Sequence, residues 1–99
     1  MRIRKKARSP GSSREEIERF IVSAVARACR CNPDAVTGAT RLIDLGVDSL
    51  TLTGIYALCE MTYGRFDEDE ESRMLQAIHV GDIVTIVSQS VSKDGQLAG

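Results

Sequence analysis

The sequence predicts an all-α fold: a small four-helix bundle with three main helices, one short helix and a long first connection. Apolar residues recur at helical spacing in two long segments, which begin near residues 13 and 48. A third segment, near residues 79–90, is rich in β-branched residues, but no second strand-like segment could pair with it, so a helix is favoured. With 99 residues, no Trp and 4% aromatics, the chain should form one domain with an aliphatic core.

The first helix is predicted to begin at Ser13, because Ser13 and Glu16 have the spacing of a capping box and Glu15 complements the helix dipole. Its apolar positions follow the i, i+3, i+4, i+7 rule. These positions are Ile17, Phe20, Ile21, Ala24, Val25 and Ala28. We expect Pro33 to end the helix, since the residue before a proline avoids the helical region, and Asn32-Pro33-Asp34 is typical of a turn.

Residues 35–47 contain too much Gly and Thr for a long helix and show no alternation typical of a strand. We expect an extended connection whose apolar residues pack on the helices. These residues are Val36, Leu42, Ile43, Leu45 and Val47. A connection of this length is usually functional or disordered, and its apolar content favours packing.

The second helix is predicted to run from Asp48, a good N-cap, to Tyr63, with Gly64 as its C-terminal stop. Its apolar positions are Leu50, Leu52, Ile55, Tyr56, Leu58 and Cys59. Gly54 inside this helix costs roughly 1 kcal/mol relative to Ala. That cost is tolerable if a neighbour or a bound group approaches closely there.

The acidic run at residues 67–71 lacks the central Gly and the ligand spacing of an EF-hand. We interpret it as a solvated segment that leads into a short helix over residues 72–77. The last helix is predicted to begin at His79 or Val80 and to end near Ser90. Its buried residues should be Val80, Ile83, Val84 and Val87.

These elements divide the chain into a disordered basic tail (residues 1–12), a folded domain (13–90) and a flexible C-terminal tail (91–99). Five of the thirteen basic residues lie in the first eight positions, so the folded part is acidic and suits partners with basic docking surfaces. These five are Arg2, Arg4, Lys5, Lys6 and Arg8. An arm for nucleic acid or an anionic surface is the alternative, but no aromatics interleave the charges, so we expect no nucleic-acid partner.

No apolar run approaches the roughly 20 residues that span a bilayer, and no apolar stretch follows the basic N-terminus at signal-peptide distance. We therefore expect a cytoplasmic protein without membrane contact, and a monomer by default. The chain has three cysteines, Cys29, Cys31 and Cys59. Because a disulfide framework needs an even number, we expect reduced thiols. A Cys-x-Cys metal site would need further ligands, and His79 is the only histidine, so we expect no metal.

The most informative stretch is residues 42–50, where Gly46 tightens an apolar loop and Asp48-Ser49 opens the second helix. The hydroxyl of Ser49 is thereby expected on the surface at a helix N-terminus, where free N–H groups and the helix dipole favour a negatively charged substituent. A phosphate esterified to Ser49 would be well placed. A catalytic role for Ser49 is disfavoured, because the only histidine is far along the chain and no Gly-x-Ser-x-Gly elbow is present.

The run Leu45-Gly46-Val47-Asp48-Ser49-Leu50, between amphipathic helices, resembles the phosphopantetheine-attachment motif of acyl carrier proteins. A second, weaker signature is Val80-Gly81-Asp82-Ile83-Val84, and the resemblance covers residues 13–90. It implies the same four-helix fold, and a separate Mg²⁺-dependent phosphopantetheinyl transferase that attaches the 4′-phosphopantetheine of coenzyme A to Ser49. The resulting carrier would hold acyl groups as thioesters, without catalytic activity of its own.

The resemblance also implies roles in partner recognition for Gly46, Val47, Asp48 and Leu50. Asp48 would cap the helix and belong to the transferase-recognition motif, and Gly46 would allow a tight approach, with a plain turn as its alternative. Leu50 is either an apolar docking contact or a core residue. The implied partners are the transferase, an acyl-loading ligase or acyltransferase, and synthases, synthetases and acyl-modifying enzymes.

The second helix departs from the pattern of carriers in primary fatty acid synthesis, because Glu60 is its only acid after Asp48. This favours a dedicated pathway, such as polyketide or lipopeptide biosynthesis. One alternative is an aminoacyl or peptidyl carrier of nonribosomal peptide synthesis, although such carriers more often have His before the serine. The others are a helical adaptor that takes no cofactor, and Asp48-Ser49 as nothing more than a helix cap.

Overall fold

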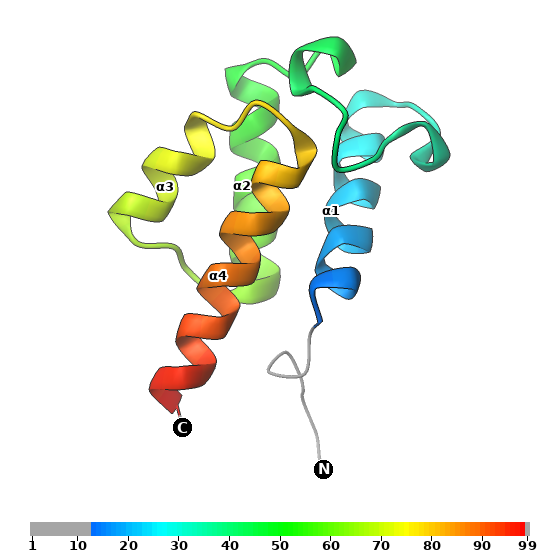
Figure 1. Cartoon of the computed structure of the whole chain (residues 1–99). Coiled ribbons are helices and arrows are strands. Elements are labelled where there is room, and N and C mark those ends of the chain that lie inside the picture. The colour runs from blue at the N-terminus through cyan, green and yellow to red at the C-terminus, as the bar shows by residue number, and fades with distance from the viewer. Residues whose placement is uncertain (1–12, 99) are drawn as a thin grey trace.

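The computed structural model describes residues 13–98, with side chains as far as residue 92, and forms the predicted all-α four-helix bundle (Figure 1). Its helices are α1 (Arg14–Cys29), α2 (Ser49–Tyr63), α3 (Glu68–Leu75) and α4 (Val80–Ala98). The first connection contains two short 3₁₀ helices, η2 (Pro33–Ala35) and η3 (Leu42–Leu45). The predicted N-terminal tail, residues 1–12, lies outside the described residues.

Helix α1 begins with the predicted capping box. Ser13 Oγ accepts the N–H of Glu16 at 3.2 Å, and Glu16 Oε1 accepts the N–H of Ser13 at 3.0 Å. The helix ends at Cys29, earlier than Pro33, because Arg30 adopts a left-handed conformation (φ 57°) and its N–H closes the last turn. The predicted end at Pro33 was therefore wrong, and the proline instead opens η2.

The long connection is ordered by its two 3₁₀ turns and not by an extended path. Val36 and Leu42 are buried as predicted, but Ile43 is 74% exposed, so its predicted packing is wrong. A 3₁₀ helix has three residues per turn, so Leu42 and Leu45 share the inward side and Ile43 points away. An antiparallel bridge between Arg41 and His79 fastens this connection to the start of α4.

Helix α2 has the predicted bounds, with Asp48 as its N-cap and Gly64 (φ 105°) at its C-terminus. One face contributes to the core, through Leu52, Ile55, Tyr56 and Cys59. Leu58 is 37% exposed and lies at the edge of this face. Since α1 and α2 run in opposite directions, α2 begins at the end of the bundle that carries the long connection (Figure 1).

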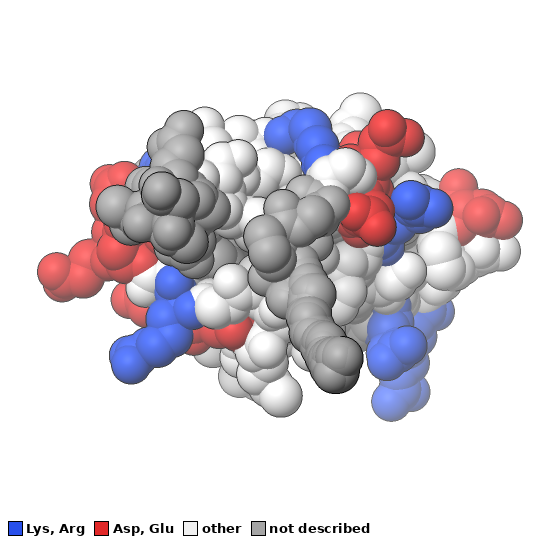
Figure 2. Space-filling model, turned by 90° about the horizontal axis from the view of Figure 1, so that it is seen from below, with Lys and Arg blue, Asp and Glu red and all other residues white. Residues whose placement is uncertain are grey.

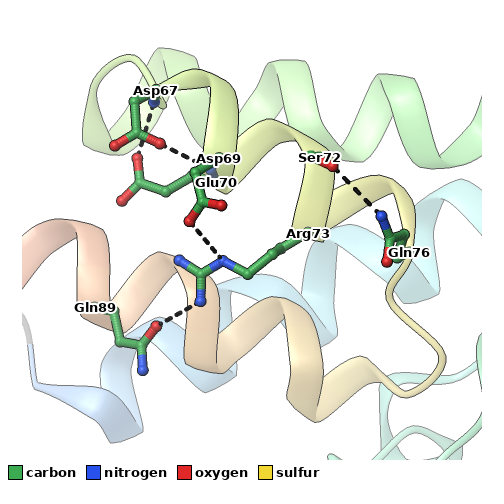
Figure 3. A network of polar contacts seen from close by, with 7 residues as sticks. All are labelled: Asp67, Asp69, Glu70, Ser72, Arg73, Gln76 and Gln89. Carbon is green, nitrogen blue, oxygen red and sulfur yellow. Dashed lines mark hydrogen bonds and ion pairs between the residues drawn. The ribbon is translucent and has the colours of Figure 1, made fainter.

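Helix α3 begins earlier than predicted, because the acidic run is part of the helix. Asp67 and Glu70 form a reciprocal capping box, with N···O distances of 2.7 and 2.9 Å, and Glu70 is buried. The predicted helix over residues 72–77 therefore had the wrong bounds, because α3 begins at Glu68 and ends at Leu75. Of residues 67–71, all but Glu70 are exposed, as predicted. Arg73 bridges to Asp69 at 3.3 Å and to Gln89 of α4 at 3.1 Å, which ties α3 to α4 (Figure 3).

Helix α4 begins at Val80 as predicted and continues to Ala98, so its predicted end near Ser90 was wrong. Val91 still packs against the core and Ser90 is buried, which extends the buried side of the helix past that point. Its four predicted buried residues are each at most 1% exposed, and with α1 they form the centre of an aliphatic core. None of the described helices has the length and hydropathy required to cross a membrane.

Candidate functional site

The loop before α2 turns at Gly46, which ends η3 in a left-handed conformation (φ 80°). Its N–H donates to the carbonyl of Ile43 at 3.1 Å, and the N–H of Val47 donates to that of Leu42 at 3.1 Å. A Cβ atom at Gly46 would meet nothing within 4 Å. Gly46 is therefore required for its backbone conformation and not for lack of space inside the described protein.

Asp48 fixes the start of α2. Its Oδ1 accepts the N–H of Thr51 at 2.8 Å, and its carbonyl accepts the N–H of Leu52 at 2.9 Å. The hydrogen bond from Thr51 is the main reason that the pKa of Asp48 lies below its ordinary value. The carboxylate is exposed and negatively charged at neutral pH, so it both caps the helix and adds charge beside Ser49.

Ser49 is the first residue of α2, and its side chain is exposed. Its carbonyl accepts the Thr53 hydroxyl at 2.8 Å, which holds the first turn, whereas its own hydroxyl has no hydrogen bond to another described residue. Ser49 lies at the N-terminus of a 15-residue helix, which is the positive end of the helix dipole. This environment fits a phosphodiester: an accessible hydroxyl to esterify and a dipole that stabilises the negative charge.

His79 is held at the start of α4 by Asp82, and within the described residues it forms no hydrogen bond with Ser49. Its Nδ1 lies 3.6 Å from Asp82 Oδ2, and the same carboxylate oxygen accepts the N–H groups of Ile78 and His79 at 2.9 and 2.8 Å. These two N–H groups lower the pKa of Asp82. The contacts of His79 therefore support a structural role at the cap of α4.

Exposed apolar side chains are found on η3, on α2, at the end of α3 and in the α3–α4 loop. Leu50, next to Ser49, is 82% exposed, so it is not a core residue, whereas Val47 is half-buried against the core. The N–H of Leu42 donates to the carbonyl of Ile78 at 2.8 Å, which places the α3–α4 loop beside η3. The exposed set is Ile43, Leu50, Leu58, Met61, Leu75 and Ile78.

The single acid within α2, Glu60, is directed toward the neighbouring elements. Its Oε2 accepts the N–H of Phe66 at 3.2 Å and lies 3.3 Å from the Tyr56 hydroxyl. The outward face of α2 is therefore uncharged over its described length. At the opposite end of the bundle, both acidic and basic side chains lie at the edges of the visible face (Figure 2).

The Tyr56 hydroxyl also donates to Glu71 Oε2 of α3 at 2.8 Å, a contact that sequence reasoning missed. Burial and the neighbouring carboxylates raise the pKa of Tyr56 well above its ordinary value, so the phenol is protonated. The only sequence signal was the i, i+4 spacing of Tyr56 and Glu60, since Glu71 comes from another helix.

Two grooves flank α2. A groove of about 130 Å³ between α2 and α3 is lined by Thr53, Tyr56, Glu71 and Leu75. A larger one of about 360 Å³ lies between α1 and α2 and includes Gly54. A Cβ atom at Gly54 would meet nothing within 4 Å, so no neighbour within the described protein requires this glycine.

The cysteines are free thiols, as expected. Cys59 is fully buried, and burial raises the pKa of its thiol to about 12. Within the described part of the chain, no group of three or more His, Cys, Asp or Glu side chains is arranged to hold a metal ion.

A comparison with protein-family models finds one described as "phosphopantetheine attachment site", which matches residues 19–70. This range contains η2, η3, Asp48, Ser49 and the whole of α2. Searches of curated proteins and of solved structures found no match.

Proposed function

Because the chain belongs to the phosphopantetheine-attachment family, whose members are carriers with a covalent 4′-phosphopantetheine, we propose that Ser49 is its attachment site and that it carries acyl groups. The observation that supports this most directly is the hydroxyl of Ser49. It is exposed, has no hydrogen bond within the described protein, and lies at the positive end of α2 inside the matched range.

The attached group supplies a terminal thiol that can hold an acyl group as a thioester. The chain's own contribution is to present and stabilise the attachment point. Gly46 turns the loop, Asp48 fixes the first turn of α2, and the helix dipole stabilises the negative charge of a phosphodiester on Ser49. No residue of this site is required to act as an acid or base, so the carrier has no catalytic activity of its own.

Carriers of this family interact with a phosphopantetheinyl transferase and with synthases, and we propose that these partners approach the end of the bundle around Ser49. Leu50 supports this proposal, because an exposed leucine next to the modified serine offers an apolar contact to a partner. Asp48 adds the charge of the recognition motif, and Gly46 and Val47 shape the loop. The remaining partners would be an acyl-loading ligase or acyltransferase and the enzymes that modify the acyl group.

We assign the carrier to a dedicated biosynthetic pathway, of the polyketide or lipopeptide type, in the cytoplasm. The outward face of α2 has no free acid, because Glu60 is engaged by Phe66 and Tyr56. A partner that reads several acids on α2 through a basic patch would find no such pattern here. The Asp before Ser49 favours an acyl over a peptidyl carrier.

The test is the intact mass of the protein after incubation with coenzyme A, Mg²⁺ and a broad-specificity phosphopantetheinyl transferase. Wild type and a Ser23→Ala control, which changes an exposed serine of α1, should each gain one phosphopantetheine. Ser49→Ala should gain none while retaining its helical circular dichroism. A gain on Ser49→Ala would move the site elsewhere, and no gain on folded wild type would leave the helical adaptor as the better explanation.

A further inference from the structure

The basic N-terminal tail has no role in the proposed carrier function. Residues 1–12 contain five of the thirteen basic residues and no acid, so all fourteen acidic residues belong to the rest of the chain. The tail and the folded domain therefore carry opposite charge and attract each other. A polyanion such as nucleic acid would be attracted by the tail but repelled by the domain.

A groove of about 530 Å³ lies between α1 and η2, larger than either of the grooves that flank α2. One wall is helical and the other belongs to the long first connection, because η2 packs against α1. The groove is lined by Glu15, Glu18, Arg19, Val22, Ser23, Pro33 and Asp34.

Three carboxylates against one guanidinium make this groove acidic. Glu15, Glu18 and Asp34 are exposed, and none of them forms an ion pair with another described residue. The carboxylate of Asp34 is not used to cap η2, because the side chain of Asn32 accepts the Asp34 N–H at 2.9 Å. All three carboxylates are therefore available to cations.

The same groove offers apolar surface beside its charges. Val22 is half-buried on α1, and the exposed ring of Pro33 opens η2. Long Lys and Arg side chains lay their methylene stems on apolar surface and keep the charged head in water. A basic segment therefore fits this groove better than a small inorganic cation does.

The tail is attached beside the groove and is long enough to fill it. Glu15, in the first turn of α1, already lines the groove. Ser23, the furthest lining residue of α1, lies about 15 Å from Ser13 at about 1.5 Å per residue. The eight residues from Lys5 to Ser13 span up to about 27 Å when extended, so Lys5 reaches every part of the groove.

The sequence also favours the direction that this requires. Ser9-Pro10-Gly11-Ser12 has proline and glycine at the two central positions, which is typical of a type II turn. Such a turn reverses the chain directly before α1 begins. The residues that precede it are thereby directed back along the helix, toward the groove.

We propose that residues 2–8 bind in the groove between α1 and η2, with cationic side chains on Glu15, Glu18 and Asp34. Exposed ion pairs are individually weak, but a short tether gives an effective concentration in the millimolar range, so a few pairs suffice. The bound tail fastens η2 to α1 and withholds its charge from anionic partners. The sequence alone favours a solvated tail, because it does not show this groove.

The test is the backbone order of the tail in the full chain, measured by NMR relaxation of the amides of residues 5–8. At about 0.01 M salt, where charges act over about 30 Å, their order parameters should exceed about 0.6, below which a backbone is flexible. In about 1 M salt, where that range is about 3 Å, they should fall below this value. Nuclear Overhauser contacts from Lys5 or Lys6 to Val22 should be lost together with the order.

Variants identify the groove as the binding site. Glu18→Gln and Asp34→Asn, from its two walls, should each lower the order parameters of the tail. Glu68→Gln removes the same charge from an exposed position of α3 outside the groove, so it should leave them unchanged. All three positions are exposed, and circular dichroism checks that the fold is retained.

Three results would overturn the proposal. The first is a flexible tail in the wild type at low salt, including one that becomes ordered only when a short DNA duplex is added. The second is an equal loss of order in Glu68→Gln and Glu18→Gln, which would indicate a general attraction to the acidic domain. The third is a set of contacts that weakens on dilution, because the tail would then occupy the groove of a second copy.

Discussion

The carbonyl oxygen of Gly38 and the backbone of Gly81 are in direct contact, with the Gly81 N–H donating to that oxygen at 2.8 Å. A Cβ atom added to Gly81 would lie 2.9 Å from the same oxygen, closer than real Cβ contacts come. This contact joins the long first connection to the first turn of α4. It gives a physical reason for a glycine in the run Val80-Gly81-Asp82, which the sequence offered only as a weak family signature.

Gly81→Ala should therefore destabilise the fold. To relieve the contact, the backbone oxygen of Gly38, which also accepts a hydrogen bond, must move. Overpacking of this kind lowers the stability by about 1–3 kcal/mol. The higher helix propensity of Ala offsets up to about 1 kcal/mol of that loss. Denaturant unfolding followed by circular dichroism measures the loss. Gly38→Ala is the matched control, because a Cβ atom at this position would lie 3.7 Å from the nearest atom. This variant should have nearly the stability of the wild type. Equal losses of stability in both variants would contradict the explanation.

Features with local causes were predictable from the sequence. The capping box of Ser13 and Glu16 and the N-cap at Asp48 involve groups three residues apart, so the spacing contains the information needed. The same spacing occurs at Asp67 and Glu70, but the density of negative charge there is also typical of a solvated segment. Here the capping hydrogen bonds and the helix dipole outweigh the repulsion between the acids.

Features that depend on tertiary contacts could not be predicted. The exposure of Ile43 follows from a 3₁₀ turn that the composition of the connection does not specify. The hydrogen bond between Tyr56 and Glu71 joins two helices through groups 15 residues apart. For the site itself, the motif predicted an exposed serine at the start of α2, and this is where Ser49 lies. Whether Leu50 was core or surface required the packing of the whole bundle.

Gly46→Ala should destabilise the loop that presents Ser49 through backbone strain alone. No atom lies within 4 Å of a Cβ placed there, but φ is 80°, and a left-handed conformation costs an L-residue about 1–2 kcal/mol. Chemical denaturation should report a loss of that size. Gly46→Asn should lose less, because Asn tolerates this conformation better, and a loss as large as that of Ala would point to a steric cause instead.

Gly54→Ala should stabilise the protein. The position is inside α2, its added Cβ would meet no other atom within 4 Å, and Ala is preferred over Gly in a helix by about 0.8–1.0 kcal/mol. The midpoint of thermal unfolding should rise by about 4 °C or more for a domain of this size. A fall in the midpoint would show that this glycine serves the fold in a way that its surroundings do not reveal.

Cys59 should resist alkylation in the folded protein. Burial raises the pKa of its thiol from 9.0 to about 12, so at pH 8 the reactive thiolate is about a thousandfold less populated than in an exposed cysteine. The side chain is also inaccessible to the reagent. Treatment with iodoacetamide followed by peptide mass spectrometry should leave Cys59 unmodified under native conditions and modified in denaturant. Equal modification in both conditions would mean that the core opens readily around this residue.

Attachment of phosphopantetheine to Ser49 should raise the pKa of Asp48. In the unmodified protein, the N–H of Thr51 stabilises the carboxylate at 2.8 Å and lowers its pKa below the ordinary value. A phosphodiester on the next residue adds a negative charge, and a like charge disfavours ionisation, so the shift is upward. A pH titration of the Asp48 carboxyl carbon by NMR, before and after modification, measures this shift.

Ser49→Ala taken through the same incubation should show no change in the pKa of Asp48. A pKa that stays constant or falls in the modified protein would mean that the phosphate lies away from Asp48 and that the start of α2 does not hold it.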